Sequence, residues 1–153
     1  MPVIRAYLDT NVIISGLLSE EGYPRIILDV LSLRLPGLKG VTGKFNILEL
    51  RDNIKKKLPQ LEKPFNDATK KLNLEIVGLP ESPEVHGLKE IISPKDAPVL
   101  ASALGAGCDC LITGDKHFKA DGLKKAGLKI RIVTPAEFVE EVLPAIMKYP
   151  AGS

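Results

Sequence analysis

Apolar residues along the chain follow two patterns: short continuous runs, typical of buried strands, and spacings of three or four residues, typical of helices. The first run, residues 3–8, ends abruptly in Asp9-Thr10-Asn11 before apolar residues resume at Val12. Further runs predict strands over 38–42, 74–77, 109–113 and 128–133. Helical spacing predicts helices over 11–19, 23–32, 44–57, 64–72, 93–105 and 134–148, with a short helical stretch around Leu123.

This alternation of strands and helices predicts the fold class. Strands separated by helices form a parallel sheet with right-handed crossovers and helices on both faces. We therefore expect a three-layer α/β sandwich with a central parallel sheet of about five strands. Prolines make residues 78–87 the one long loop, which contains His86. A chain of 153 residues predicts a single domain, 1–153, with a frayed tail from about residue 149.

Several acids of the chain stand in segments that also suit a helix start. Ser93-Pro94-Lys95-Asp96 and Thr134-Pro135-Ala136-Glu137 each place a hydroxyl at the N-cap, a proline next and an acid three residues on. Asp9-Thr10-Asn11 is likewise rich in good N-cap residues. A structural role is therefore the competing interpretation for each acid, and we expect Glu137 to have that role alone.

Composition narrows the function without deciding it. With 21 basic and 19 acidic residues the net charge is +2, so any contact with nucleic acid must be local. The run Lys55-Lys56-Lys57 is interpreted as a solvated helix face.

No apolar run approaches the 18 residues of a membrane span, and no signal peptide begins the chain, so we expect a cytoplasmic protein. Cys108 and Cys110 are expected to be reduced packing residues.

Four acids are predicted to meet at one edge of the sheet. Asp9 and Asp115 end strands, Asp96 starts a helix, and Glu49 lies in the second turn of the helix over 44–57. Helices of this fold class run antiparallel to the strands, so helix starts and strand ends share an edge. Ligands of open α/β sheets bind beyond that edge.

Carboxylates that converge repel one another unless a cation neutralises them. Clusters of oxygen ligands suit hard divalent cations such as Mg²⁺ or Mn²⁺, whereas the His and Cys spacing of a zinc site is missing from the sequence. Magnesium pairs with substrate phosphates, which favours metal-assisted hydrolysis of phosphodiesters.

The chain resembles a PIN domain, the ribonuclease domain common in bacterial and archaeal toxins of the VapC type. The resemblance lies in Leu8-Asp9-Thr10-Asn11-Val12, Ile47-Leu48-Glu49-Leu50, Asp96 ahead of Leu100-Ala101-Ser102-Ala103-Leu104, and Leu111-Ile112-Thr113-Gly114-Asp115. The closing Ile132-Val133-Thr134-Pro135-Ala136-Glu137-Phe138 is similar to the end of one toxin-like branch.

This resemblance implies an acidic site and its supporting groups. The catalytic acids would be Asp9, Glu49, Asp96 and Asp115, of which Asp9, Asp96 and Asp115 would bind the metal, with support from Thr10, Asn11, Thr113 and His117. His117 stands where many relatives have a further acid, which places the second metal position in question. The resemblance further implies an RNA substrate, a possible cognate antitoxin protein and a homodimer.

Three functions remain open from the sequence. The leading hypothesis is a Mg²⁺- or Mn²⁺-dependent endoribonuclease in which a metal-activated water attacks phosphorus. The alternative is a catalytically weak PIN-like module that binds RNA or protein. A phosphotransferase with Asp9 as covalent nucleophile is disfavoured, because Asn11 stands where such enzymes have a second aspartate.

Overall fold

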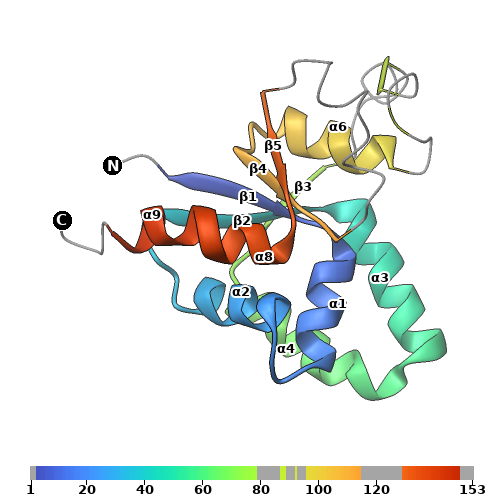
Figure 1. The fold of residues 1–153 in the computed structure, drawn as a ribbon. Coiled ribbons are helices and arrows are strands. Elements are labelled where there is room, and N and C mark those ends of the chain that lie inside the picture. The colour runs from blue at the N-terminus through green and yellow to red at the C-terminus, as the bar shows by residue number, and fades with distance from the viewer. Residues whose placement is uncertain (1–2, 79–86, 89–91, 93–95, 115–128, 149–153) are drawn as a thin grey trace.

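The computed structural model describes residues 3–78, 87–88, 92, 96–114 and 129–148 of the chain (Figure 1). Its centre is a sheet of five parallel strands in the order β3-β2-β1-β4-β5. The strands are β1 (Ile4–Leu8), β2 (Leu38–Gly43), β3 (Glu75–Val77), β4 (Cys110–Ile112) and β5 (Arg131–Val133). The sheet confirms the predicted fold class, including the number of strands.

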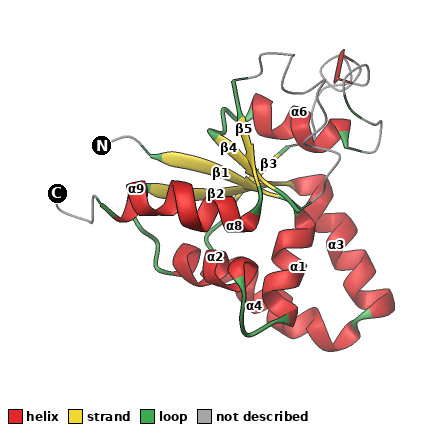
Figure 2. Ribbon diagram, viewed as in Figure 1, coloured by secondary structure: helices red, strands yellow, loops and turns green. Residues whose placement is uncertain are grey.

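Helices cover both faces of this sheet (Figure 2). On one face lie α1 (Thr10–Leu18), α2 (Tyr23–Ser32), α3 (Lys44–Lys57), a 3₁₀ turn (Pro59–Leu61), α4 (Glu62–Lys71) and the C-terminal helical segments. The other face packs against α6 (Ala97–Gly105). The expected loop around His86, the helical stretch around Leu123 and the tail from residue 149 lie outside the described residues.

A hydrophobic core lies between the sheet and its helices on each face, and β1 contributes side chains to both cores. Ala6 and Leu8 pack under α1–α4, whereas Tyr7 points to the opposite face and packs under α6. Successive side chains of a strand alternate between faces, so a continuous apolar run is what a strand buried on both sides requires. The two cysteines lie in these cores as free thiols, as expected, and burial raises the pKa of Cys108 to about 11 and that of Cys110 to about 12.

The C-terminal helix departs from the prediction of one continuous helix over 134–148. It consists of α8 (Pro135–Glu137), a π-helical segment (Phe138–Val142) and α9 (Leu143–Met147). Pro144 is the physical reason, because its ring clashes with an ordinary helical turn and its nitrogen cannot donate to the carbonyl four residues earlier. The predicted capping box at its start is present, with Thr134 and Glu137 exchanging two hydrogen bonds of 3.0 Å.

Two other helix starts also differ from the sequence-based boundaries. The helix predicted over 64–72 begins earlier, at Glu62, because Pro64 falls in the first turn, where a missing N–H has no helical partner to lose. Asp96 was expected as the third residue of a helix opened by Ser93, but α6 begins at Ala97 and Asp96 directly precedes it. Residues 93–95 lie outside the described part of the chain.

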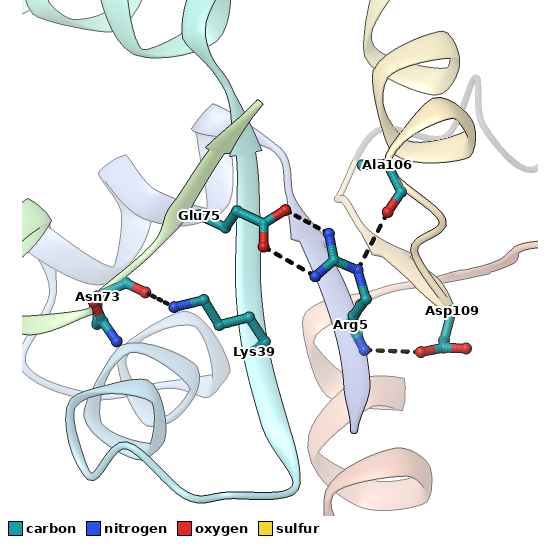
Figure 3. A network of polar contacts seen from close by, with 6 residues as sticks. All are labelled: Arg5, Lys39, Asn73, Glu75, Ala106 and Asp109. Atoms are coloured by element: carbon teal, nitrogen blue, oxygen red, sulfur yellow. Dashed lines mark hydrogen bonds and ion pairs between the residues drawn. The ribbon is translucent and has the colours of Figure 1, made fainter. Parts of the chain in front are cut away.

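Polar contacts tie the strands together at the amino end of the sheet (Figure 3). The Arg5 guanidinium donates to both carboxylate oxygens of Glu75 on β3, at 3.0 and 2.5 Å, and to the Ala106 carbonyl at 3.2 Å. The Arg5 backbone N–H donates to Asp109, and Lys39 donates to the Asn73 carbonyl. This network lies at the opposite end of β1 from Asp9, so it supports the sheet without reaching the carboxyl edge.

The sheet order reverses between β1 and β4. From β1 the chain extends the sheet through β2 and β3 in one direction and through β4 and β5 in the other. β1 pairs with β4 in a register that aligns Leu8 with Ile112. The residues that follow these two strands, Asp9 and Thr113, therefore face each other at the reversal point, where open α/β sheets bind their ligands.

Candidate functional site

A cavity of about 310 Å³ lies at this carboxyl edge. Three carboxylates from different elements line it: Asp9 between β1 and α1, Glu49 on α3, and Asp96 before α6. Polar and apolar side chains complete the lining, namely Thr10, Asn11, Asn46, Asn53, Ile14, Phe45, Leu50 and Val99. The predicted convergence of Asp9, Glu49 and Asp96 at one edge of the sheet is therefore present.

Asp9 occupies the N-cap position of α1, yet its side chain makes no capping hydrogen bond. The carboxylate is instead held by two hydroxyls: Thr113 donates to Oδ2 at 2.7 Å, and Thr10 donates to Oδ1 at 3.4 Å. Only 8% of Asp9 is exposed. The Asp9 carboxylate is buried, is oriented by two hydroxyls and does not cap α1. These are the features of a carboxylate that binds a metal ion.

Asp96 also stands directly before a helix without using its side chain as a cap. It is buried, with 7% exposed, and its backbone carbonyl accepts a hydrogen bond of 3.2 Å from the Leu100 N–H. Its carboxylate therefore lies against the cavity rather than on the surface. The predicted capping box that pairs Asp96 with Ser93 involves residues 93–95, which lie outside the described part of the chain, so it stays a prediction from the sequence.

Glu49 differs from the two aspartates because it is exposed, at the rim of the cavity. Its place in the second turn of α3 follows from the sequence, since α3 begins at Lys44, immediately after β2. Of the supporting residues, Thr10 is half-buried and Asn11 is exposed in the lining, while Thr113 is buried. Asp115 and His117 lie outside the described residues.

The lining fits a hard cation in its chemistry. All candidate ligands in it are oxygen donors, and none of its members within the described part of the chain is His, Cys, Lys or Arg. Among those same residues, no three acidic, His or Cys side chains come close enough to hold a metal by themselves. Mg²⁺ does not require three, because it keeps several waters and binds through one or two carboxylates. Asp9 and Asp96 are the buried candidates for that role.

Sequence reasoning missed two asparagines of the site. Asn46 and Asn53 line the cavity together with Glu49, at spacings of three and four residues along α3. That spacing places all three on one helix face, so the position of Glu49 was itself the signal that could have found them. Asn46 is buried, with 5% exposed, and it accepts a hydrogen bond of 2.7 Å from the Tyr7 hydroxyl.

The fold and the acid-lined edge define a class of α/β domain with a candidate hydrolytic site at the reversal of its strand order. The sequence profile of the PIN domain family matches residues 5–117. The chain belongs to the PIN domain family. A search of curated proteins found no match.

Solved structures support the same fold at low sequence identity. VapBC2 from Rickettsia felis, bound to a promoter DNA fragment, is 15% identical with a TM-score of 0.62, over 86% of this chain and 98% of that one. VapBC-1 from nontypeable Haemophilus influenzae is 20% identical with a TM-score of 0.59, over 87% and 99%. PAE2754 from Pyrobaculum aerophilum is 15% identical with a TM-score of 0.53, over 97% and 98%. At these identities the likeness establishes the shared fold.

None of the helices in the described part of the chain is both long and apolar enough to cross a membrane.

Proposed function

We propose that this protein is a Mg²⁺- or Mn²⁺-dependent endoribonuclease and the toxin of a toxin–antitoxin pair acting in the cytoplasm. One observation carries the proposal: in a PIN domain, carboxylates from three separate elements line one cavity where the strand order reverses. A set of oxygen ligands beside a space of this size suits a cation together with a phosphate.

Each acid has a role that follows from its burial. Asp9 and Asp96, both buried, would bind the cation, and Thr113 and Thr10 hold the Asp9 carboxylate in one orientation. Asp115 is a further proposed ligand from the sequence alone. A bound Mg²⁺ or Mn²⁺ would supply a water of lowered pKa and would offset the charge of the phosphate.

Glu49 has the freedom that proton transfer requires, because it is exposed at the rim while the aspartates are fixed. We assign it to orient the attacking water and to accept its proton. The apolar members of the cavity lining, Ile14, Phe45, Leu50 and Val99, lower the solvation of groups bound beside them. Reduced solvation strengthens the electrostatic contacts made there.

A cleavage assay tests this function. We expect the purified protein to cut single-stranded RNA with Mg²⁺ or Mn²⁺ and to stop in excess chelator. Asp9→Asn is expected to abolish cleavage because it removes the charge that holds the cation. Glu137→Gln is the matched control, since Glu137 belongs to a capping box that a glutamine oxygen still completes. Equal cleavage by wild type and Asp9→Asn would contradict the proposal. RNA binding without cleavage would indicate a PIN-like module without turnover.

The proposed partner is an antitoxin, because some of the similar structures are toxin–antitoxin complexes. Co-expression with any small open reading frame that neighbours the gene tests it. A complex that co-purifies and suppresses RNA cleavage is expected, and free, fully active protein would contradict the proposal.

Light scattering after gel filtration tests the proposed homodimer, for which we expect twice the chain mass of 16.6 kDa.

A further inference from the structure

A buried hydrogen bond links the middle of β1 to the candidate site. Tyr7, two residues before Asp9, is fully buried, and its hydroxyl donates to Asn46 Oδ1 at 2.7 Å. Asn46 is the third residue of α3 and lines the cavity beside the acids. The core under α6 therefore holds one side chain of the site through a single phenol.

Gly43, at the end of β2, makes this contact sterically possible. A Cβ added there would come within 2.6 Å of the Tyr7 hydroxyl and 2.8 Å of Asn46 Oδ1. Only a residue without a side chain lets the strand end pass so close to both atoms. The three residues form one packed unit at the start of α3.

The Tyr7 hydroxyl fixes the orientation of the Asn46 side chain. A neutral phenol has one O–H to donate, and Asn46 Oδ1 accepts it. The carboxamide of Asn46 therefore has a fixed rotation, in which Nδ2 is the group that remains for the cavity.

The cavity needs donors, because its acids and a substrate phosphate are both acceptors. No Lys or Arg is among the described residues that line it. The side-chain donors that remain in the lining are the amides of Asn11, Asn46 and Asn53, because the Thr10 hydroxyl already donates to Asp9. Asn11 and Asn53 are exposed, so solvent competes for their amides and they are free to rotate. Asn46 alone among these amides is buried and held by a buried partner.

We propose that Asn46 contacts the substrate, donating Nδ2–H to a non-bridging oxygen of the RNA phosphate, and that Tyr7 is the positioning residue that aims it. This inference rests on the proposed ribonuclease function and adds a residue to it. A preorganised neutral donor stabilises the growing negative charge on the phosphate oxygens without the repulsion that a further acid would add. The Asn46 carboxamide is already held in this rotation before the substrate binds, so the side chain loses no conformational freedom during the reaction.

A binding experiment tests the contact without requiring cleavage. Uridine 5′-monophosphate with Mg²⁺ offers a phosphate but no internal phosphodiester, and uridine alone is its control. In spectra of ¹⁵N-labelled wild-type protein, the Asn46 side-chain NH₂ signals are expected to shift with the monophosphate and to stay unmoved with uridine. In Tyr7→Phe the same signals are expected to shift less. Asn46 signals that ignore the monophosphate would overturn the proposal.

Kinetics supply the second readout. Asn46→Asp keeps an oxygen for Tyr7 but loses the donor, so we expect kcat to fall by about 100-fold, with the smaller effect on KM. Tyr7→Phe is expected to lose about tenfold in kcat, and Asn66→Asp, the same change on the exposed face of α4, to lose nothing. If Asn46→Asp and Asn46→Ala both cleave at the wild-type rate, the inference fails while the ribonuclease stands. If the wild type cleaves no RNA but Asn46 still responds to phosphate, the ribonuclease proposal fails and the phosphate contact stands.

Discussion

The Thr113 hydroxyl donates a 2.7 Å hydrogen bond to Asp9 Oδ2 across the point where the strand order of the sheet reverses. Thr113 follows β4 and Asp9 follows β1, and the aligned ends of these strands bring the two side chains together. The bond joins the two halves of the sheet and fixes the one buried acid that immediately follows a described strand. The acid site and the sheet topology are thus linked by a single hydroxyl.

Thr113→Val should therefore weaken both folding and metal binding. Valine keeps the shape but leaves a buried carboxylate oxygen without this donor, a loss of about 1.5–3 kcal/mol for a bond to a charged group. Loss of such an orienting partner also lowers metal affinity, by about 10–100-fold. Denaturant unfolding in chelator and calorimetric Mg²⁺ titration measure the two effects. Thr113→Ser, which retains the hydroxyl, is expected to stay near wild type, and a valine variant with full Mg²⁺ affinity would contradict the assignment.

Asp96→Asn separates a capping role from a metal-binding role. A lost cap would cost about 1 kcal/mol or less and leave cleavage intact. We expect instead that removing one of several neighbouring carboxylates stabilises the metal-free protein and weakens Mg²⁺ binding and cleavage together. Melting curves in chelator and in Mg²⁺ measure this, because Mg²⁺ raises the wild-type Tm through binding to the native state. A variant that melts lower in chelator and keeps the full Mg²⁺ shift would return Asp96 to a structural role.

The Arg5–Glu75 pair at the other end of the sheet predicts a pH-dependent contribution to stability. The hydrogen bond from Arg5 lowers the pKa of Glu75 below its ordinary value of 4.5. The contribution is therefore complete above that value and is lost as the pH falls through the lowered pKa. Both side chains are partly exposed, at 28% and 40%, so solvent screening limits it to about 1 kcal/mol.

Denaturant unfolding of Glu75→Gln measures this contribution. The variant should be less stable than wild type near neutrality, and the gap should close as the pH is lowered from above 4.5. Glu141→Gln, which weakens the more exposed Arg131–Glu141 pair, provides a control with a smaller gap. A gap for Glu75→Gln that widens in acid would show that the sign is wrong.

The sequence predicted the parallel sheet and the placement of Asp9, Glu49 and Asp96 at one edge of it. Both follow from the alternation of strands and helices along the chain. In a parallel sheet, strand ends and helix starts share an edge, so acids at these positions are brought together by topology alone. The prediction needed no knowledge of any side-chain contact. Asp115 and His117, which lie outside the described residues, remain predictions from the sequence.

Tyr7 and Asn46 were missed for a physical reason. Tyr7 belongs to an apolar run, and its ring packs in the core like that of any buried aromatic residue. Asn46 is an ordinary polar residue in the first turn of a helix. The bond between them joins residues 39 positions apart and depends on the close approach at Gly43. Neither periodicity nor motif spacing contains that information. The π-helical segment before Pro144 was missed similarly, because a continuous helix was assumed from apolar spacing.

Anomalous diffraction from crystals grown with Mn²⁺ tests most directly whether the acids at this edge hold a divalent cation. We predict a single strong peak in the cavity, in direct coordination contact with carboxylate oxygens of Asp9 and Asp96, with waters completing the coordination. Crystals of Asp9→Asn grown under the same conditions should lose that peak while keeping the fold. If wild-type protein cleaves RNA in the same Mn²⁺ concentration but the map shows no cation against Asp9, or shows one elsewhere on the chain, the proposed site is contradicted.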